Sequence, residues 1–197
     1  MTKVKICGLF RECDIDYVNE AMPDYIGFVF AKSPRQVSAE TSKLLRNRLH
    51  PGIVPVGVFV NAEQEEILRL CAEHIIEMVQ LHGQEDDLYI KALKSRTGVP
   101  VIKAVRMDAA NTQRMLPSKA DFLLLDSGKG GTGKAFDWGQ IPAVSQPYFL
   151  AGGINETNIR AAVRMHPYCV DISSGAETGG VKDKNKILRL VREVREI

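Results

Sequence analysis

The sequence predicts an α/β protein in which eight parallel strands alternate with helices and close into a (β/α)8 barrel. Two observations favour this fold. Short apolar runs alternate with segments of helical spacing along the whole chain, which gives eight strand-helix units. No Pro/Ser-rich linker, low-complexity tract or change of composition interrupts these units, so residues 1–197 are expected to form a single compact domain. With 197 residues, the chain lies at the short end of the range for such barrels.

An open, doubly wound sheet is the alternative that could be built from the same units. The glycine fingerprint of its dinucleotide-binding members would follow the first strand, but Cys7, Gly8 and Leu9 stand there. In a closed barrel (TIM barrel), the last strand pairs with the first and the active site lies at the carboxyl ends of the strands. The barrel therefore indicates where functional residues should be sought.

The predicted strands are short apolar runs, the first of which is closed by Gly8. They are Val4–Cys7, Tyr25–Phe30, Val54–Val60, Met78–Leu81, Val101–Val105, Phe122–Leu125, Phe149–Ala151 and Val170–Ile172. The predicted helices rest on apolar spacing and on caps, with Ser38 as the N-cap of the second helix and Asn61 as that of the third. They are Glu12–Met22, Ser38–Leu49, a segment after Asn61, Asp86–Ser95, a segment near Asp108–Leu116, a short one within Trp138–Val144, Asn158–Met165 and the amphipathic Lys182–Glu196.

Two turns of small residues follow the last two predicted strands. Gly152 and Gly153 follow one strand, and Ser173, Ser174 and Gly175 follow the next. Such turns leave backbone N–H groups bare, so an anion can approach without a side chain in the way. A short helix starting near Gly175 would add its free N-terminal amides. One such turn alone is equally compatible with ordinary chain reversal, but two on consecutive strands predict a phosphate site.

The composition excludes several classes of protein. Net charge is +2, and no run of basic residues forms a stripe, so neither nucleic acid nor an anionic membrane is an expected partner. The N-terminal segment lacks the apolar core of a secretory signal, and no apolar stretch is long enough to span a membrane. The four cysteines show neither CxxC pairing nor zinc-ligand spacing, so free thiols in a reducing compartment are expected. We predict a cytoplasmic protein.

The residues at the predicted strand ends combine a thiol, a carboxyl group and basic side chains. They are Cys7, Lys32, Arg35, Gln80, His82, Arg106 and Asp126, beside the turns of Gly and Ser. Such a set suits proton transfer on a phosphorylated small molecule, in which one group removes a proton and another delivers one elsewhere. It requires no cofactor and no metal, because the His and carboxylate residues show no ligand spacing.

Each of these residues also has a structural interpretation. Cys71 and Cys169 lie within helix and strand patterns and are expected to be buried apolar groups, whereas Cys7 ends a strand immediately before Gly8. Asp126 precedes a Gly-rich loop and not a predicted helix, so it is not expected to be a helix N-cap. His82 suits a substrate contact and a structural hydrogen bond equally well.

Three further charged residues are expected to have specific partners. Arg35 lies in a loop that Pro34 stiffens, and its guanidinium fork suits a carboxylate. Lys5 shares the inward parity of Cys7 and would face Asp171 once the first and last strands pair. We expect these two residues to form a buried ion pair, which is structural more often than catalytic.

The chain resembles the phosphoribosylanthranilate isomerases of tryptophan biosynthesis. The resemblance is carried, in the family's order and over nearly the whole length, by VKICGL, GFVFAKSPRQV, VGVFVN, VQLHG, DSGKGGTGKAFDW, LAGGIN and VDISSGAE. It implies a (β/α)8 barrel that performs an Amadori rearrangement, the third step of tryptophan biosynthesis from chorismate. The aminoaldose N-(5-phosphoribosyl)anthranilate would become 1-(2-carboxyphenylamino)-1-deoxyribulose 5-phosphate.

The resemblance also implies roles for individual residues. Asp126 would be the general acid that opens the ribose ring, and Cys7 the general base that takes the C2 proton. Arg35 would hold the anthranilate carboxylate, with His82 as a further substrate contact. The phosphate would be bound by Gly152, Gly153, Ser174 and Gly175, chiefly through main-chain N–H groups. A thiol pKa of about 8.5 must fall, or its thiolate must be stabilised, for this role, and Lys5 or the strand-end dipoles are the expected cause.

Two other functions remain open at this point. The isomerase of histidine biosynthesis resembles this barrel and performs the same rearrangement, but it has a carboxylate at the position of Cys7 and usually two phosphate-binding half-barrels. A non-catalytic phosphosugar-binding or thiol-sensing module would bind without turnover. A monomer is favoured over a homodimer because no surplus apolar face stands out, and residues 127–134 are the candidate lid because their glycines permit hinge motion.

Overall fold

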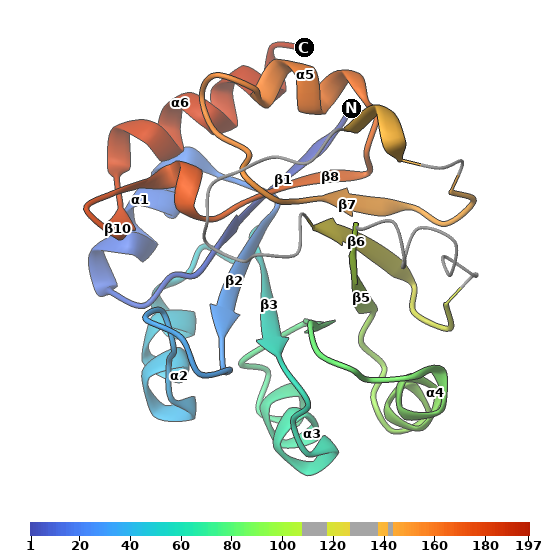
Figure 1. The fold of residues 1–197 in the computed structure, drawn as a ribbon. Coiled ribbons are helices and arrows are strands. Elements are labelled where there is room, and N and C mark those ends of the chain that lie inside the picture. The colour runs from blue at the N-terminus through green and yellow to red at the C-terminus, as the bar shows by residue number, and fades with distance from the viewer. Residues whose placement is uncertain (108–117, 127–137, 142–143) are drawn as a thin grey trace.

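The computed structural model describes residues 1–107, 118–126, 138–141 and 144–197, and Figure 1 shows how their elements are arranged. Within these ranges, eight parallel strands pair in chain order and form a closed barrel, with β1 hydrogen-bonded to both β2 and β8. The strands are β1 (Lys3–Cys7), β2 (Tyr25–Val29), β3 (Val54–Phe59), β4 (Met78–Leu81), β5 (Val101–Arg106), β6 (Phe122–Asp126), β7 (Tyr148–Leu150) and β8 (Cys169–Ile172). The predicted barrel is confirmed.

Helices surround the barrel in Figure 1, and the N-terminal strand lies beside the last strand of the barrel. The described α-helices are α1 (Glu12–Ala21), α2 (Ala39–Arg48), α3 (Gln64–Ala72), α4 (Asp87–Arg96), α5 (Ile159–Arg164) and α6 (Lys184–Arg195). Ser38 caps α2 as predicted, because its hydroxyl accepts the N–H of Thr41 at 3.1 Å. The helix predicted near Asp108–Leu116 and the candidate lid at 127–134 lie outside the described residues.

Two predicted helix starts are wrong for identifiable physical reasons. Asn61 does not cap α3, whose N-cap is Glu63; instead Asn61 adopts a positive φ of 51°, and its side-chain oxygen accepts the N–H of Gln84. The short helix predicted within Trp138–Val144 is present as a single 3-10 turn, η2 (Trp138–Gln140). Lys182 does not begin the last helix, because it lies in a small hairpin of β9 (Glu177–Thr178) and β10 (Val181–Lys182).

Apolar side chains form one core inside the barrel and others between the barrel and the helices. The interior cluster contains Tyr25, Val56, Met78, Ile102, Leu124, Phe149, Ala151 and Cys169. The strands alternate sides, so their other apolar residues pack outward against helices. In α6, the stripe of Ile187, Leu190, Val191 and Val194 is buried in this outer layer. The interior is therefore filled toward the amino ends of the strands, which leaves the carboxyl ends for the site.

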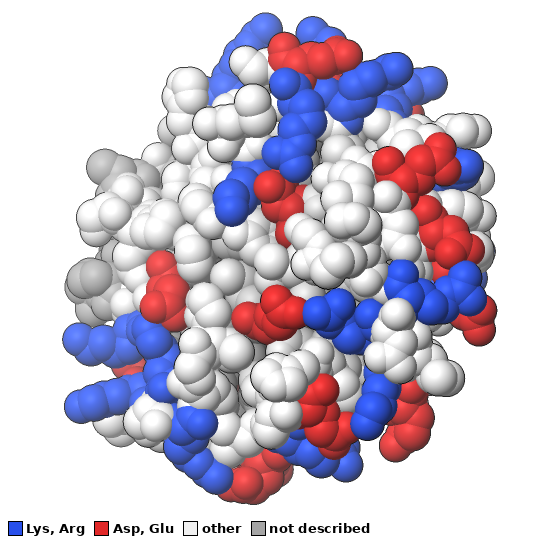
Figure 2. All heavy atoms as spheres, turned by 180° about the vertical axis from the view of Figure 1, so that it is seen from behind, with Lys and Arg blue, Asp and Glu red and all other residues white. Residues whose placement is uncertain are grey.

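The surface carries charges of both signs. Figure 2 shows Lys and Arg side chains lying beside Asp and Glu side chains over most of one face. Several of these charges form exposed ion pairs, such as Lys43 with Glu73 and Arg48 with Asp16. Among the described residues, no helix is long and apolar enough to cross a membrane.

Candidate active site

A cavity of about 370 Å³ opens at the carboxyl ends of the strands. Its lining includes seven of the eight predicted site residues: Cys7, Arg35, His82, Asp126, Gly152, Gly153 and Ser174. These residues come from separate parts of the chain and meet only because the sheet closes. Lys32 and Gln80 also line the cavity, whereas Gly175 lies behind the lining. The structure thus brings a thiol, a carboxyl group, a guanidinium group and two turns of small residues to one cavity.

Cys7 ends β1 with its side chain buried inside the barrel, in contact with the neighbouring strand. Its partner in β2 is Gly27, and a Cβ atom added there would lie 2.6 Å from the Cys7 sulfur. Glycine therefore provides the space that the thiol occupies. Burial raises the pKa of the Cys7 thiol, and the positive charges of Lys5 and Lys182 act in the opposite direction. Burial outweighs these charges, so the pKa of Cys7 is raised in the free protein, which is opposite to the lowering expected from the sequence.

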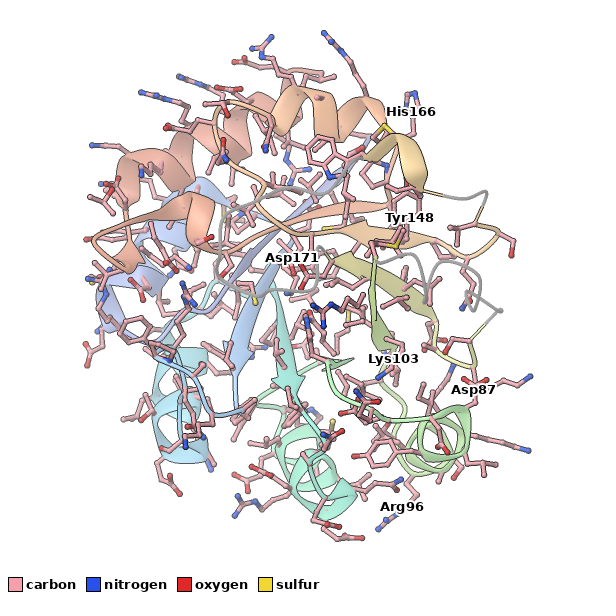
Figure 3. The ribbon with its side chains drawn as sticks, in the orientation of Figure 1. Asp87, Arg96, Lys103, Tyr148, His166 and Asp171 are labelled. Atoms are coloured by element: carbon pink, nitrogen blue, oxygen red, sulfur yellow. The ribbon has the colours of Figure 1, made fainter. Side chains whose placement is uncertain are left out.

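Lys5 and Asp171 form the predicted ion pair in the barrel interior, and Figure 3 shows Asp171 at its centre. The Lys5 ammonium lies 3.0 Å from both carboxylate oxygens of Asp171 and 2.9 Å from the side-chain oxygen of Gln80. Burial alone would lower the pKa of Lys5, but Asp171 and the Cys7 thiol outweigh it, so that pKa is raised. Lys5 is thus held as a cation next to Cys7.

Arg35 does not point freely into the cavity, because Glu177 holds it. Its Nε and one terminal nitrogen each lie 2.7 Å from a different carboxylate oxygen of Glu177. Glu177 also pairs with the buried ammonium of Lys182, which donates a second hydrogen bond to the backbone oxygen of Ser173. Burial favours neutral Glu177, yet Arg35 and Lys182 together lower its pKa. The β9-β10 hairpin therefore positions Arg35: Glu177 holds its guanidinium group, and Lys182 in turn holds Glu177.

His82 and Asp126 are paired across the cavity, with His82 Nε2 3.3 Å from Asp126 Oδ2. The other ring nitrogen of His82 lies 3.0 Å from the amide nitrogen of Gln80. His82 follows β4 directly, and the loop after it is held by Glu85, whose carboxylate accepts the N–H groups of Asn61 and Gly83. Lys103 on β5 donates to the same carboxylate at 2.8 Å, and Figure 3 labels its position. The loop that carries His82 is therefore fixed from both neighbouring strands.

The two turns of small residues lie against each other, as the phosphate prediction requires. Gly152 and Gly153 adopt φ values of 86° and 70°, which L side chains rarely accept. Their N–H groups donate no hydrogen bond to any other described residue, so they are available to an anion. A Cβ at Gly175 would lie 1.9 Å from the backbone oxygen of Ile154, so only glycine allows the turns to meet this closely.

The segment after β8 differs from the predicted short helix. It forms one 3-10 turn, η3 (Ser174–Ala176), and continues directly into β9. The backbone oxygen of Gly153 is meanwhile held by the amides of Asn155 and Asn158, at 3.0 and 2.9 Å. The candidate anion site therefore consists of two turns and does not include the N-terminus of an α-helix.

Sequence reasoning missed the roles of Glu177, Lys182 and Glu85 in this site. Glu177 and Lys182 follow the last barrel strand and bear no periodic signal, because their positions depend on a hairpin only two residues per strand long. Glu85 lies in a loop between a strand and a helix, where a carboxylate is common, so the sequence gives no sign of its role. Within the described ranges, no group of three or more His, Cys, Asp or Glu residues has an arrangement that could hold a metal ion.

Fold and site together define a (β/α)8-barrel protein with a carboxyl group, a thiol and two turns of small residues on one cavity. Comparison with known proteins narrows this class. Residues 4–193 match the family model described as N-(5'phosphoribosyl)anthranilate (PRA) isomerase. The chain is 48% identical to the N-(5'-phosphoribosyl)anthranilate isomerase of Endomicrobium trichonymphae, with both chains covered over 100% of their length. The chain belongs to the N-(5'-phosphoribosyl)anthranilate isomerase family.

Two solved structures of this family resemble the chain over its whole length. One is a phosphoribosyl anthranilate isomerase in complex with reduced 1-(o-carboxyphenylamino)-1-deoxyribulose 5-phosphate, at 33% identity, a TM-score of 0.84 and 100% coverage of both chains. The other is described as mutually generated monomers of the dimeric enzyme from Thermotoga maritima, at 31% identity, a TM-score of 0.80 and 100% coverage of both chains. The fold and the connectivity of the barrel are thus those of this isomerase family.

Proposed function

We propose that the chain converts N-(5-phosphoribosyl)anthranilate into 1-(2-carboxyphenylamino)-1-deoxyribulose 5-phosphate, with Asp126 as general acid and Cys7 as general base. The observation that carries the proposal is the shared cavity: both groups line it, together with the bare N–H groups of Gly152 and Gly153. A phosphate bound at one end of the cavity would leave the ribose within reach of both groups. Family membership supplies the identity of the substrate.

Binding would involve both ends of the substrate. The turns at Gly152, Gly153, Ser174 and Gly175 bind the phosphate, Gly175 by allowing the two turns to meet. Arg35 binds the anthranilate carboxylate, because its guanidinium group presents several donors and Glu177 fixes its plane. His82 contacts the substrate between these ends. Two anionic groups at opposite ends would orient the sugar without any covalent bond.

The rearrangement then needs two proton transfers. Asp126 donates its proton to the ring oxygen of ribose as the C1–O bond breaks, and the nitrogen lone pair forms a C1=N double bond, giving a protonated Schiff base. Cys7 as thiolate takes the proton from C2, and the C–H electron pair forms a C1=C2 bond while the C=N electrons return to nitrogen. The enolamine becomes the ketone when its hydroxyl proton is lost and C1 gains a proton.

The charges around Cys7 are suited to its role. Burial keeps the thiol neutral in the free protein, while Lys5 and Lys182 favour the thiolate. Ring opening creates a positive Schiff base next to C2, which adds a third positive charge near the sulfur. We therefore expect the thiol to release its proton to solvent after the ring has opened, so that the thiolate is present when the C2 proton is removed.

The test is an assay with phosphoribosylanthranilate generated in situ from anthranilate and phosphoribosyl pyrophosphate, which follows the loss of fluorescence. The wild type is expected to be active, and Cys7→Ala and Asp126→Asn to lose the activity. Cys13→Ala at a half-buried position and Asp16→Asn at an exposed position, both on α1 and outside the cavity lining, are the matched controls and should keep it. Activity that survives in one active-site variant would refute that residue's role.

An inactive wild type would refute the proposed reaction. The same assay with the aminosugar phosphate of histidine biosynthesis would then separate the related isomerase from a protein that binds phosphosugars without turnover. One phosphate-binding pair of turns is the feature that favours the tryptophan-pathway substrate, because the other substrate has a phosphate at each end.

We also propose that the protein acts as a cytoplasmic monomer. Among the described residues, the exposed large apolar side chains lie on unconnected elements, which supports this assembly state. They are Met1 and Ile197 at the chain ends, Met22 after α1, Leu44 on α2, Val60 after β3 and Leu88 on α4. Light scattering after size-exclusion chromatography tests it, and a mass of twice 21.8 kDa would refute it.

A further inference from the structure

A continuous chain of polar contacts crosses the barrel interior from Asp171 to Asp126. Asp171 contacts Lys5, Lys5 contacts Gln80 at 2.9 Å, Gln80 contacts His82 at 3.0 Å, and His82 contacts Asp126 at 3.3 Å. The chain begins next to Cys7 and ends at Asp126. It therefore links the surroundings of the proposed base with the proposed acid.

The direction of each hydrogen bond in this chain is fixed by chemistry. The ammonium of Lys5 can only donate, so the atom of Gln80 that faces it must be the oxygen. The amide NH2 of Gln80 then faces His82. The reverse orientation would place the NH2 group against the ammonium, donor facing donor, and would leave Asp171 as the only acceptor that Lys5 has among these groups. Gln80 is 2% exposed, so solvent does not offer an alternative partner.

The same reasoning extends to the imidazole ring. An NH2 group can only donate, so Nδ1 of His82 must accept and cannot carry a proton. The proton of the neutral ring is then on Nε2, the atom that faces Oδ2 of Asp126. His82 thus presents an N–H group, and not a lone pair, toward Asp126. A proton carried by the Asp126 carboxyl group belongs on its other oxygen.

We propose that Gln80 is a positioning residue for the reaction: held by Lys5, it fixes His82 as the Nε2–H tautomer, which orients the carboxyl group of Asp126. This inference rests on the proposed function, in which Asp126 is the general acid. It gives Lys5 a second role besides its charge near Cys7, because Lys5 sets the orientation of the Gln80 amide. It also means that His82 presents an N–H group to Asp126 and does not compete with it for the acid proton.

The tautomer is read directly from ¹⁵N-¹H correlation spectra of the full-length wild-type protein with ¹⁵N-labelled histidine. The chain has four histidines, and loss of one set of signals in His82→Gln assigns the ring. We expect a pyrrole-like Nε2 and a pyridine-like Nδ1 for His82. A pyrrole-like Nδ1 in the wild type would overturn the proposal, and the His82→Gln protein is needed only to assign the signals.

Gln80→Glu provides the second readout. A carboxylate would face Nδ1 and accept from it, so both ring nitrogens of His82 should become pyrrole-like. The kcat should fall about tenfold or more, within the range that proton-transfer groups supply, while KM changes less than about threefold. Gln84→Glu makes the same substitution at an exposed position and should change neither readout. An unchanged His82 spectrum and unchanged kcat in Gln80→Glu would overturn the proposal.

The two proposals fail separately, because the tautomer is measured without substrate. If the protein shows the Nε2–H tautomer but does not turn over phosphoribosylanthranilate, the proposed function is refuted. The orientation of Gln80 and the tautomer of His82 would still hold, but they would not serve a general acid. An active enzyme with the Nδ1–H tautomer would refute only the role of Gln80.

Discussion

The sulfur of Cys7 fills the space that a side chain at Gly27 would need. A Cβ at position 27 would lie 2.6 Å from the Cys7 sulfur and 3.2 Å from its Cα, both shorter than ordinary contacts. The two residues are register partners in β1 and β2, so neither backbone can move without disturbing the barrel. Gly27 therefore belongs to the site although it carries no functional group.

This relationship predicts that Gly27→Ala displaces the thiol and lowers kcat by at least about tenfold, since general-base catalysis depends on position. Gly57→Ala is the matched control. Its Cβ would also be crowded, at 2.7 Å from Ile76 and Phe59 side chains, but away from Cys7. Both variants should lose about 1–3 kcal/mol of unfolding free energy through overpacking. Equal kcat values in the two variants would contradict the role given to Gly27.

Lys5→Met is predicted to raise the pKa of Cys7 further. Lys5 lowers that pKa in the native protein, so its removal leaves burial less opposed. At a fixed pH, the thiolate fraction falls and alkylation of Cys7 by iodoacetamide slows, and the pH profile of alkylation moves to higher pH. Mass spectrometry of the Cys7 peptide measures the rate, with Cys13 as an internal reference.

The same variant leaves the carboxylate of Asp171 buried without its partner, which should cost about 3–5 kcal/mol of stability. Lys5→Met/Asp171→Asn removes this defect and should recover much of the stability. Lys5 acts on the pKa of Cys7 more strongly than Asp171 does, so slower alkylation is expected in the double variant too. An alkylation profile identical to that of the wild type in both variants would show that Lys5 does not assist the thiolate.

Arg35→Met is predicted to weaken substrate binding. Loss of a charge-assisted contact to the anthranilate carboxylate should cost about 1.5–3 kcal/mol, or roughly tenfold to 100-fold in KM. Inhibition constants for a product analogue with and without the carboxylate measure this directly: the wild type should prefer the carboxylate form, and Arg35→Met should not. Arg48→Met, at an exposed ion pair on α2, is the control. A wild type that binds both analogues equally would rule out this role.

The barrel could be predicted from the sequence because its strands and their closing turns are local patterns. Phe149–Ala151 and Gly152 lie next to each other in the chain, so an apolar run and the turn after it are visible together. Lys5 and Asp171 could also be paired, because barrel closure alone makes the first and last strands neighbours. Local spacing and topology thus account for most of the cavity's lining.

The remaining features depend on contacts that no local pattern encodes. Glu177 holds Arg35 across 142 positions of sequence, through a hairpin too short to show alternation. Asn61 looks like a helix cap because its residue type suits that position, but the carbonyl oxygen of its side chain serves the Gln84 N–H of the next loop instead. The orientation of Gln80 required the Lys5 contact to be known. The roles of these residues depend on which distant side chain each one contacts, and the sequence alone does not show those contacts.

The acid and base roles are separated most directly by a single-turnover measurement with substrate deuterated at C2. In Cys7→Ser, removal of the C2 proton should limit the rate, and deuterium should slow the reaction several-fold. In Asp126→Asn, ring opening precedes that step and should limit the rate, so deuterium should have almost no effect. This pair of results would support Asp126 as the acid and Cys7 as the base. A large isotope effect in Asp126→Asn together with none in Cys7→Ser would contradict the account.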